Sequence, residues 1–126
     1  MIVGVGTDII EIQRIEDALA HTEGLKQRLF TSREIAYCES MRRPAMHFAA
    51  RFAAKESVFK AMGTGWRGGI RFDEIEIVND QLGRPELVLH GKAKEWFEAN
   101  RISGTHVSLS HIRELAQAFV VLERAG

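Results

Sequence analysis

The chain has 126 residues, 17 of them basic and 17 acidic, so its formal net charge is zero and broad electrostatic binding to nucleic acid or to a membrane surface is not expected. Cys38 is its only cysteine, which excludes an internal disulfide and fits a reducing compartment. The sequence has no signal segment and no apolar run long enough to span a bilayer, so we expect one cytoplasmic globular domain over residues 1–126.

Residues 1–12 are rich in β-branched side chains and predict an N-terminal strand. Gly4 and Gly6 permit close approach of another backbone or of a ligand. Asp8 lies inside or at the end of this apolar run, where burying an unpaired carboxylate is costly. Two interpretations stay open: Asp8 caps a turn or a helix, or it serves as a metal ligand or catalytic acid.

Three short helices are expected next, over residues 13–20, 24–30 and 31–41. The first of them directs Arg14 away from its apolar face. The third begins with Thr31 and Glu34 at the spacing of a capping box, in which each side chain bonds the backbone N–H of the other residue.

A long helix is predicted from Pro44, which suits a first helical turn, to Gly63, which suits a left-handed cap. Its first stripe is apolar and consists of Phe48, Phe52, Phe59 and Met62. Its second stripe combines small and charged residues, namely Ala49, Ala53, Glu56 and Lys60. The two charged residues of this stripe form either a solvated pair one turn apart or part of a site.

Residues 63–69 are rich in glycine, but they follow a helix, whereas the glycine-rich loops that hold phosphates precede one. We therefore exclude a Walker loop at this position. The segment is expected to be a flexible connector that is able to touch a ligand.

Strand patterns dominate the remaining residues. We expect strand character over 70–78, a turn at 79–83, a strand over 84–89, a helix over 92–100, and strands over 105–111 and 115–122. In the first of these last two strands, Val107 and Leu109 alternate with His106, Ser108 and Ser110. The polar face is either exposed to solvent or the wall of a site whose hydroxyl and imidazole groups bind phosphate.

Several common catalytic motifs are absent from the sequence, which has no CxxC pair, no HExxH and no GxSxG. Asp8 and Glu56, without a histidine or cysteine cluster, suit a hard divalent cation such as Mg²⁺. Magnesium takes one or two protein carboxylates and completes its shell with water and substrate phosphates. Lys60, one helical turn beyond Glu56, is placed to contact another phosphate oxygen.

Three separate motifs resemble those of the holo-(acyl-carrier-protein) synthases, the short bacterial type of 4′-phosphopantetheinyl transferase. They are residues 6–12 with Arg14 and Ile15, residues 51–65, and residues 106–111 with residues 118–123. The hairpin region at residues 73–85 is similar as well, so the resemblance covers the chain from end to end. Ser57, where the family pattern has alanine, is a mild departure on the long helix.

The resemblance implies a single-domain α+β fold, with a mostly antiparallel sheet, one long helix packed against it, and sites between subunits. Enzymes of this family transfer the 4′-phosphopantetheine arm of coenzyme A to a serine of apo acyl carrier protein, release adenosine 3′,5′-bisphosphate, and support fatty acid biosynthesis. By the family pattern Asp8 and Glu56 bind Mg²⁺, and Lys60 contacts the phosphates. The serine proton passes either to Glu56 or to a water held at the metal site, and we favour the water.

The same resemblance implies further contacts. Arg14 is expected to meet the acidic surface of the carrier protein, with Arg28 and Arg33 adding to that patch. Contacts with coenzyme A are expected from Arg43, Arg84, His106 and Ser108.

The family forms trimers, so a homotrimer is expected here. Two other functions compete with this one: a non-catalytic module that binds coenzyme A or a nucleotide, and a structural trimerisation domain.

Overall fold

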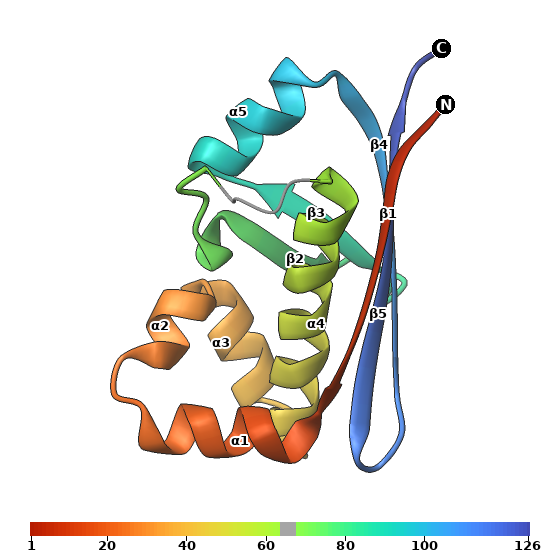
Figure 1. The fold of residues 1–126 in the computed structure, drawn as a ribbon. Helices are drawn as coiled ribbons and strands as arrows, with labels where there is room; N and C mark the ends of the chain where they lie inside the picture. Colours follow the sequence, from red (N-terminus) through yellow and green to blue (C-terminus); the bar gives the residue numbers. More distant parts are fainter. Residues whose placement is uncertain (64–67) are drawn as a thin grey trace.

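The computed structural model describes residues 1–63 and 68–126 (Figure 1). Within them, an antiparallel three-stranded sheet has the order β1-β5-β4, and a separate antiparallel hairpin pairs β2 with β3. The strands are β1 (Ile2–Glu11), β2 (Ile75–Asn79), β3 (Pro85–Leu89), β4 (Ile102–His111) and β5 (Leu115–Arg124). The expected α+β class with mostly antiparallel sheet is therefore confirmed.

One long helix lies along the three-stranded sheet, and the shorter helices lie on the side of this helix that faces away from the sheet (Figure 1). The helices are α1 (Ile12–His21), α2 (Leu25–Leu29), α3 (Ser32–Glu39), α4 (Pro44–Met62) and α5 (Gly91–Ala99). None of these described helices is long and apolar enough to cross a membrane.

The local signals at the helix ends are confirmed. Thr31 and Glu34 form a complete capping box at the start of α3. Pro44 occupies the first turn of α4, and Gly63 ends the helix in the left-handed conformation with φ of 75°. Of the predicted glycine-rich connector, residues 64–67 lie outside the described residues.

The predicted strand over residues 70–78 is wrong in its first half. Phe72–Glu74 forms a turn of 3-10 helix, and the strand begins only at Ile75. Phe72 is not paired in a sheet but stacks on Phe52, with ring centroids 5.5 Å apart, and meets Phe59 edge-on at 5.4 Å. The apolar side chain of Phe72 packs against α4. In the sequence pattern, an apolar residue that packs in this way is not distinguishable from one in a strand.

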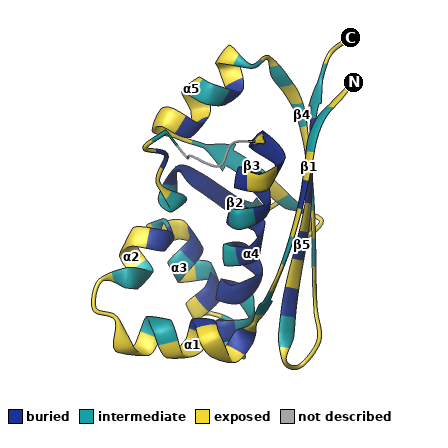
Figure 2. Cartoon of the chain, viewed as in Figure 1, coloured by how far each residue is buried: buried dark blue, intermediate teal, exposed yellow. Residues whose placement is uncertain are grey.

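Helix α4 is the centre of the core and is buried on nearly every side (Figure 2). It packs on β1 and β5 on one side and on α1 and α3 on the other. Phe48, Phe59 and Met62 are buried as predicted. The structure also buries Ala50, Ala54, Val58 and Ala61, which lie outside the predicted apolar stripe. A helix enclosed between two layers loses the polar face that a surface helix keeps.

Strand β1 approaches α4 more closely than any side chain would allow. A Cβ atom on Gly4 would lie 1.9 Å from the carbonyl oxygen of Ala61, and one on Gly6 would lie 1.9 Å from that of Ser57. Gly4 and Gly6 were predicted to permit close approach of another backbone or of a ligand, and the structure places the backbone of α4 there. This contact sets how near the next residues of β1, including Asp8, come to the helix.

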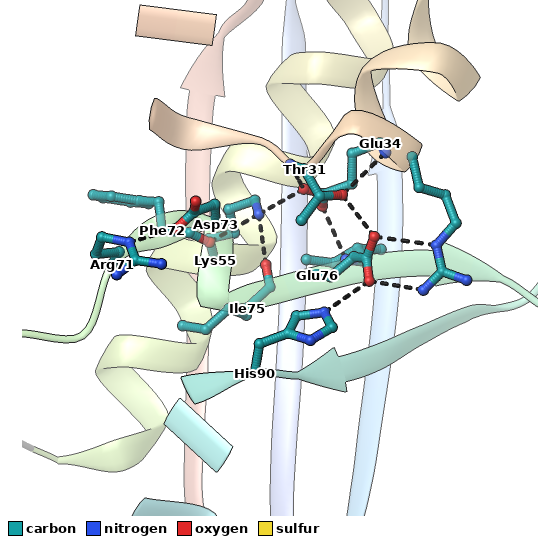
Figure 3. A network of polar contacts seen from close by, with 11 residues as sticks. Thr31, Glu34, Lys55, Arg71, Phe72, Asp73, Ile75, Glu76 and His90 are labelled. Carbon is teal, nitrogen blue, oxygen red and sulfur yellow. Dashed lines mark hydrogen bonds and ion pairs between the residues drawn. The ribbon is translucent and has the colours of Figure 1, made fainter. Parts of the chain in front are cut away.

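A buried ion pair joins α3 to α4 (Figure 3). The Lys55 ammonium and the Glu34 carboxylate are both fully buried, with 2.9 Å between Nζ and Oε1. Lys55 also donates to the carbonyls of Phe72 and Ile75, and Glu34 accepts from the backbone N–H of Ile77. Burial lowers the pKa of Lys55, and the Glu34 carboxylate opposes that shift. Every partner is hydrogen-bonded, so the pair fixes the position of the 3-10 turn against α4.

The carboxylate of Glu76, also drawn in Figure 3, makes the folding stability depend on pH. Hydrogen bonding by Arg33 lowers the pKa of the buried Glu76 to about 2, with help from Thr31 and His90. Because the folded pKa lies below the unfolded one, this stabilisation is complete above about pH 4.5 and is lost as the pH falls toward 2. We expect chemical denaturation to show a loss of about 2 kcal/mol over that range, since the exposed Arg33 is partly screened by solvent.

In the same experiment, the free energy of unfolding of Glu76→Gln should fall less between pH 4.5 and pH 2 than that of the wild type. The exposed Glu95 on α5 provides the matched control, and Glu95→Gln should follow the wild-type curve. If the free energy of unfolding falls equally with pH in Glu76→Gln and in the wild type, this carboxylate does not set the stability at acid pH.

Candidate active site

Asp8 and Lys60 meet at the junction of β1 and α4. The Lys60 ammonium donates to Asp8 Oδ1 at 3.0 Å and to the carbonyl oxygen of Thr7 at 2.9 Å. Asp8 lies three residues before the end of β1, and the N-cap of α1 is Glu11, so Asp8 does not cap that helix. The Asp8 side chain is 21% exposed and that of Lys60 53%, so solvent and ligands reach the pair.

Glu56 lies on the same stripe of α4, one turn before Lys60, and is partly exposed. Side chains four residues apart on a helix are neighbours, with about 5–6 Å between their Cβ atoms. Lys60, one turn beyond Glu56, binds Asp8 directly. The structure therefore brings together Asp8 and Lys60, which lie 52 residues apart in the sequence, and Glu56 precedes Lys60 by one helical turn.

The chemistry of this donor set fits a hard divalent cation. Asp8 and Glu56 offer only carboxylate oxygens, and Asp8 already holds a positive charge, the Lys60 ammonium. No group of three or more His, Cys, Asp or Glu side chains that could hold a metal occurs within residues 1–63 and 68–126. Any metal at this position would thus draw most of its ligands from water or substrate, as magnesium commonly does.

Arg84 and His106 line one groove, which neither Asp8 nor Lys60 lines. The groove has a volume of about 320 Å³ and lies between the β2–β3 turn and β4. Arg84 pairs with Asp80, whose pKa is lowered chiefly by the backbone N–H of Arg84. His106 contacts Glu123 on β5. Ser108 is exposed on β4, on the face shared with His106, but does not line this groove.

Arg43 is distant from Lys60 within one chain. The two residues lie at opposite ends of α4, whose 19 residues span about 28 Å at 1.5 Å per residue. The Arg43 guanidinium donates to the carbonyl oxygen of Arg113, in the turn between β4 and β5. The residues predicted to contact coenzyme A therefore occupy separate regions of one chain.

Sequence reasoning missed a second charged residue of α4, Arg51. It is only 3% exposed, its guanidinium lies 4.3 Å from the centre of the Tyr37 ring, and it donates to Asn79. Its Nε has no hydrogen-bond partner among the described residues. Burial lowers the pKa of the nearby His47, with smaller contributions from Arg51 and His111. The available signal was an arginine inside an alanine-rich helix, because a charged side chain is rarely buried unless it has a partner.

The comparisons with known proteins identify the family of this chain. Residues 4–119 match the family model described as the 4′-phosphopantetheinyl transferase superfamily, a class that agrees with the observed α+β fold. A holo-[acyl-carrier-protein] synthase of Geobacter sp. (strain M21) is 50% identical over 125 residues, covering 98% of this chain and all of that relative. The chain belongs to the holo-[acyl-carrier-protein] synthase family.

Solved structures of the family superpose on nearly the whole chain. The holo-[acyl-carrier-protein] synthase of Neisseria meningitidis has a TM-score of 0.89 and 37% identity, and the match covers 98% of this chain and all of the other. The enzyme from Bacillus anthracis, solved in complex with CoA (3′,5′-ADP), has a TM-score of 0.82 and 38% identity, with 99% of each chain covered.

Proposed function

We propose that this protein transfers the 4′-phosphopantetheine group of coenzyme A to a serine of apo acyl carrier protein and releases adenosine 3′,5′-bisphosphate. The observation that carries the proposal is the exposed Asp8–Lys60 pair beside Glu56, in a chain of the holo-[acyl-carrier-protein] synthase family. The nucleophile belongs to the carrier protein, which agrees with the absence of a nucleophile motif in the sequence. A cytoplasmic location and a role in fatty acid biosynthesis are part of the same proposal.

Asp8 and Glu56 would hold the divalent cation, Mg²⁺. When bound, the cation neutralises charge on the pyrophosphate of coenzyme A. Lys60 binds a phosphate oxygen of the donor and offsets the negative charge that develops on the leaving bisphosphate. The serine proton passes to a water beside Glu56, because a carboxylate that binds a cation is a weaker base than a free one.

The outer face of the three-stranded sheet supports assembly into a homotrimer. Strand alternation directs Val5, Ile9 and Phe119 away from α4, and they are 52%, 58% and 46% exposed. Apolar side chains gathered on one sheet face mark an interaction surface. We assign this face to contacts between copies of the chain, with the number three taken from the family resemblance.

Assembly also explains why the predicted coenzyme contacts are dispersed. Asp8 lies on β1 and His106 on β4, the two outer strands of the sheet, with β5 between them. Arg43 and Lys60 lie at opposite ends of α4. A site between subunits would let one chain supply Asp8, Glu56 and Lys60, while its neighbour supplies Arg43, Arg84 and His106.

Phe119→Glu is expected to dissociate the trimer, because each copy would place a charge in the apolar interface. Light scattering after size exclusion should report about 14.2 kDa for the variant and about three times that mass for the wild type. Transferase activity should fall with the mass. Leu82→Glu, at an exposed apolar residue of the hairpin turn, is the control and should remain a trimer. A Phe119→Glu protein that keeps the wild-type mass would move the interface elsewhere.

The carrier protein is expected to bind near α1 and α2, where Arg14 and Arg28 are exposed. Arg33, predicted to add to this patch, is instead engaged by Glu76 through two hydrogen bonds. Its charge is therefore already compensated within the chain.

Arg14→Glu should raise the KM for the carrier protein by about tenfold at low salt, because it reverses a charge that attracts an acidic partner. The difference should shrink as salt is added, and the affinity for coenzyme A should not change. Lys94→Glu on α5 makes the same charge change on a different surface and serves as the control. Equal losses of affinity for both substrates would remove Arg14 from the carrier-protein surface.

Intact mass spectrometry tests the proposed function directly. Apo acyl carrier protein incubated with the enzyme, coenzyme A and Mg²⁺ should gain one phosphopantetheine unit, and EDTA should prevent the gain. An unmodified carrier protein together with bound coenzyme A would favour a non-catalytic binding module. An unmodified carrier protein without coenzyme A binding would favour a structural domain.

A further inference from the structure

The Lys60 ammonium occupies the position on Asp8 where a bound metal ion would be expected. Its Nζ lies 3.0 Å from Asp8 Oδ1. The carboxylate therefore already has one counter-ion in the absence of ligands. The lysine side chain is 53% exposed, so its ammonium has room to move off Asp8.

A divalent cation and an ammonium group compete for the same carboxylate. Magnesium binds carboxylate oxygens at about 2.1 Å, so a lysine held at its present distance would lie within a few ångströms of a doubly charged ion. Two positive charges so close repel each other strongly at a site that is only partly exposed. The carbonyl of Thr7, which Lys60 also contacts, is neutral and does not take part in this competition.

We propose that Lys60 acts as an exchangeable counter-ion: it neutralises Asp8 in the ligand-free enzyme and leaves that carboxylate when the divalent cation binds. The released ammonium then binds an anionic oxygen of the donor, while the Thr7 carbonyl keeps the lysine near the site. The inference rests on the proposed metal role of Asp8 and Glu56. It adds that Lys60 leaves Asp8 when the metal binds and then binds the donor. Metal and donor each favour binding of the other, because the donor phosphate accepts the lysine that the metal displaces.

Mn²⁺ binding to the full chain without coenzyme A tests this exchange, with free Mn²⁺ measured by electron paramagnetic resonance. Lys60→Met should bind Mn²⁺ about tenfold more tightly than the wild type, because the competing charge is gone. Lys60→Arg, which keeps the charge, should remain close to the wild type. Adding Asp8→Asn to Lys60→Met should abolish the gain, which would place the ion at this carboxylate. Lys92→Met on α5 controls for loss of a surface lysine.

Coenzyme A provides the second readout. It should tighten Mn²⁺ binding to the wild type by a larger factor than to Lys60→Met, whose metal affinity no longer depends on moving a lysine. A folded Lys60→Met protein, verified by its thermal melt, that binds Mn²⁺ no more tightly than the wild type would overturn the exchange. If the wild type still modifies the carrier protein in an EDTA-sensitive way, that result leaves the proposed function intact. An absence of Mn²⁺ binding in every variant, with EDTA-insensitive transfer, would overturn both the exchange and the metal role of Asp8 and Glu56, and would leave the transfer reaction itself in place.

Discussion

Asp8→Ala is expected to reduce phosphopantetheine transfer by at least about a thousandfold and to leave the fold intact. The change removes one of two carboxylates assigned to the cation, and metal ions contribute several kcal/mol of charge stabilisation in such reactions. It also removes the carboxylate that Lys60 holds. The structural cost is small, because the Lys60 side chain is 53% exposed and water can solvate it once Asp8 is gone.

Steady-state transfer and a thermal melt on the same preparation separate these effects. The melting temperature should stay within a few degrees of the wild type, because exposed ion pairs contribute about 0–1 kcal/mol. Glu95→Ala, which removes an exposed carboxylate on α5, is the matched control and should retain full activity. Wild-type rates in Asp8→Ala would eliminate the assignment of this carboxylate to the metal.

Gly6→Ala is expected to lower both stability and activity, although Gly6 touches no substrate in the proposed mechanism. An added Cβ would lie 1.9 Å from the carbonyl oxygen of Ser57, and backbone on both sides leaves nothing flexible to yield. Strand β1 must then move away from α4, at a cost of about 1–3 kcal/mol or more. Asp8, two residues further along β1, moves with the strand and away from Glu56 and Lys60.

A shift of about 1 Å in a catalytic group can cost a hundredfold in rate, so we expect a loss of about that size even where the variant remains folded. Activity should be measured well below the reduced melting temperature. Gly104→Ala on β4 makes the same substitution in a strand where the nearest atom, 3.3 Å away, belongs to the movable Glu123 side chain. If Gly6→Ala and Gly104→Ala behave alike, the close approach of β1 to α4 is not what positions Asp8.

Local sequence signals predicted the secondary structure well wherever a few neighbouring residues decide it. Pro44 and Gly63 mark the two ends of α4 because one lacks an N–H that the helix does not need there and the other accepts a positive φ. Alternation along β4 correctly assigned Val107 to the inner face and Ser108 to the outer one. The error at residues 70–74 arose where local composition was ambiguous and contacts with α4 decided the conformation.

Charged residues of α4 show the limit of such reasoning more clearly. Glu56 and Lys60 were selected because they share a stripe with small residues and match a family motif. Lys55 and Arg51 are charged residues of the same helix, yet they are buried and were not selected. Their partners, Glu34 and Asn79, lie 21 and 28 residues away in the sequence, and helical periodicity contains no information about them.

The sequence by itself determined the helix ends, the alternating strands and the family resemblance, and it singled out Asp8, Glu56 and Lys60 as candidates. These follow from short-range backbone chemistry and from motifs that are readable in one dimension. Only the tertiary structure decided that Lys60 binds Asp8, that Lys55 is buried against Glu34, and that Arg84 and His106 share a groove. The physical reason is that each such contact depends on how closely two distant segments pack, and that distance is set by contacts such as Gly6 against Ser57.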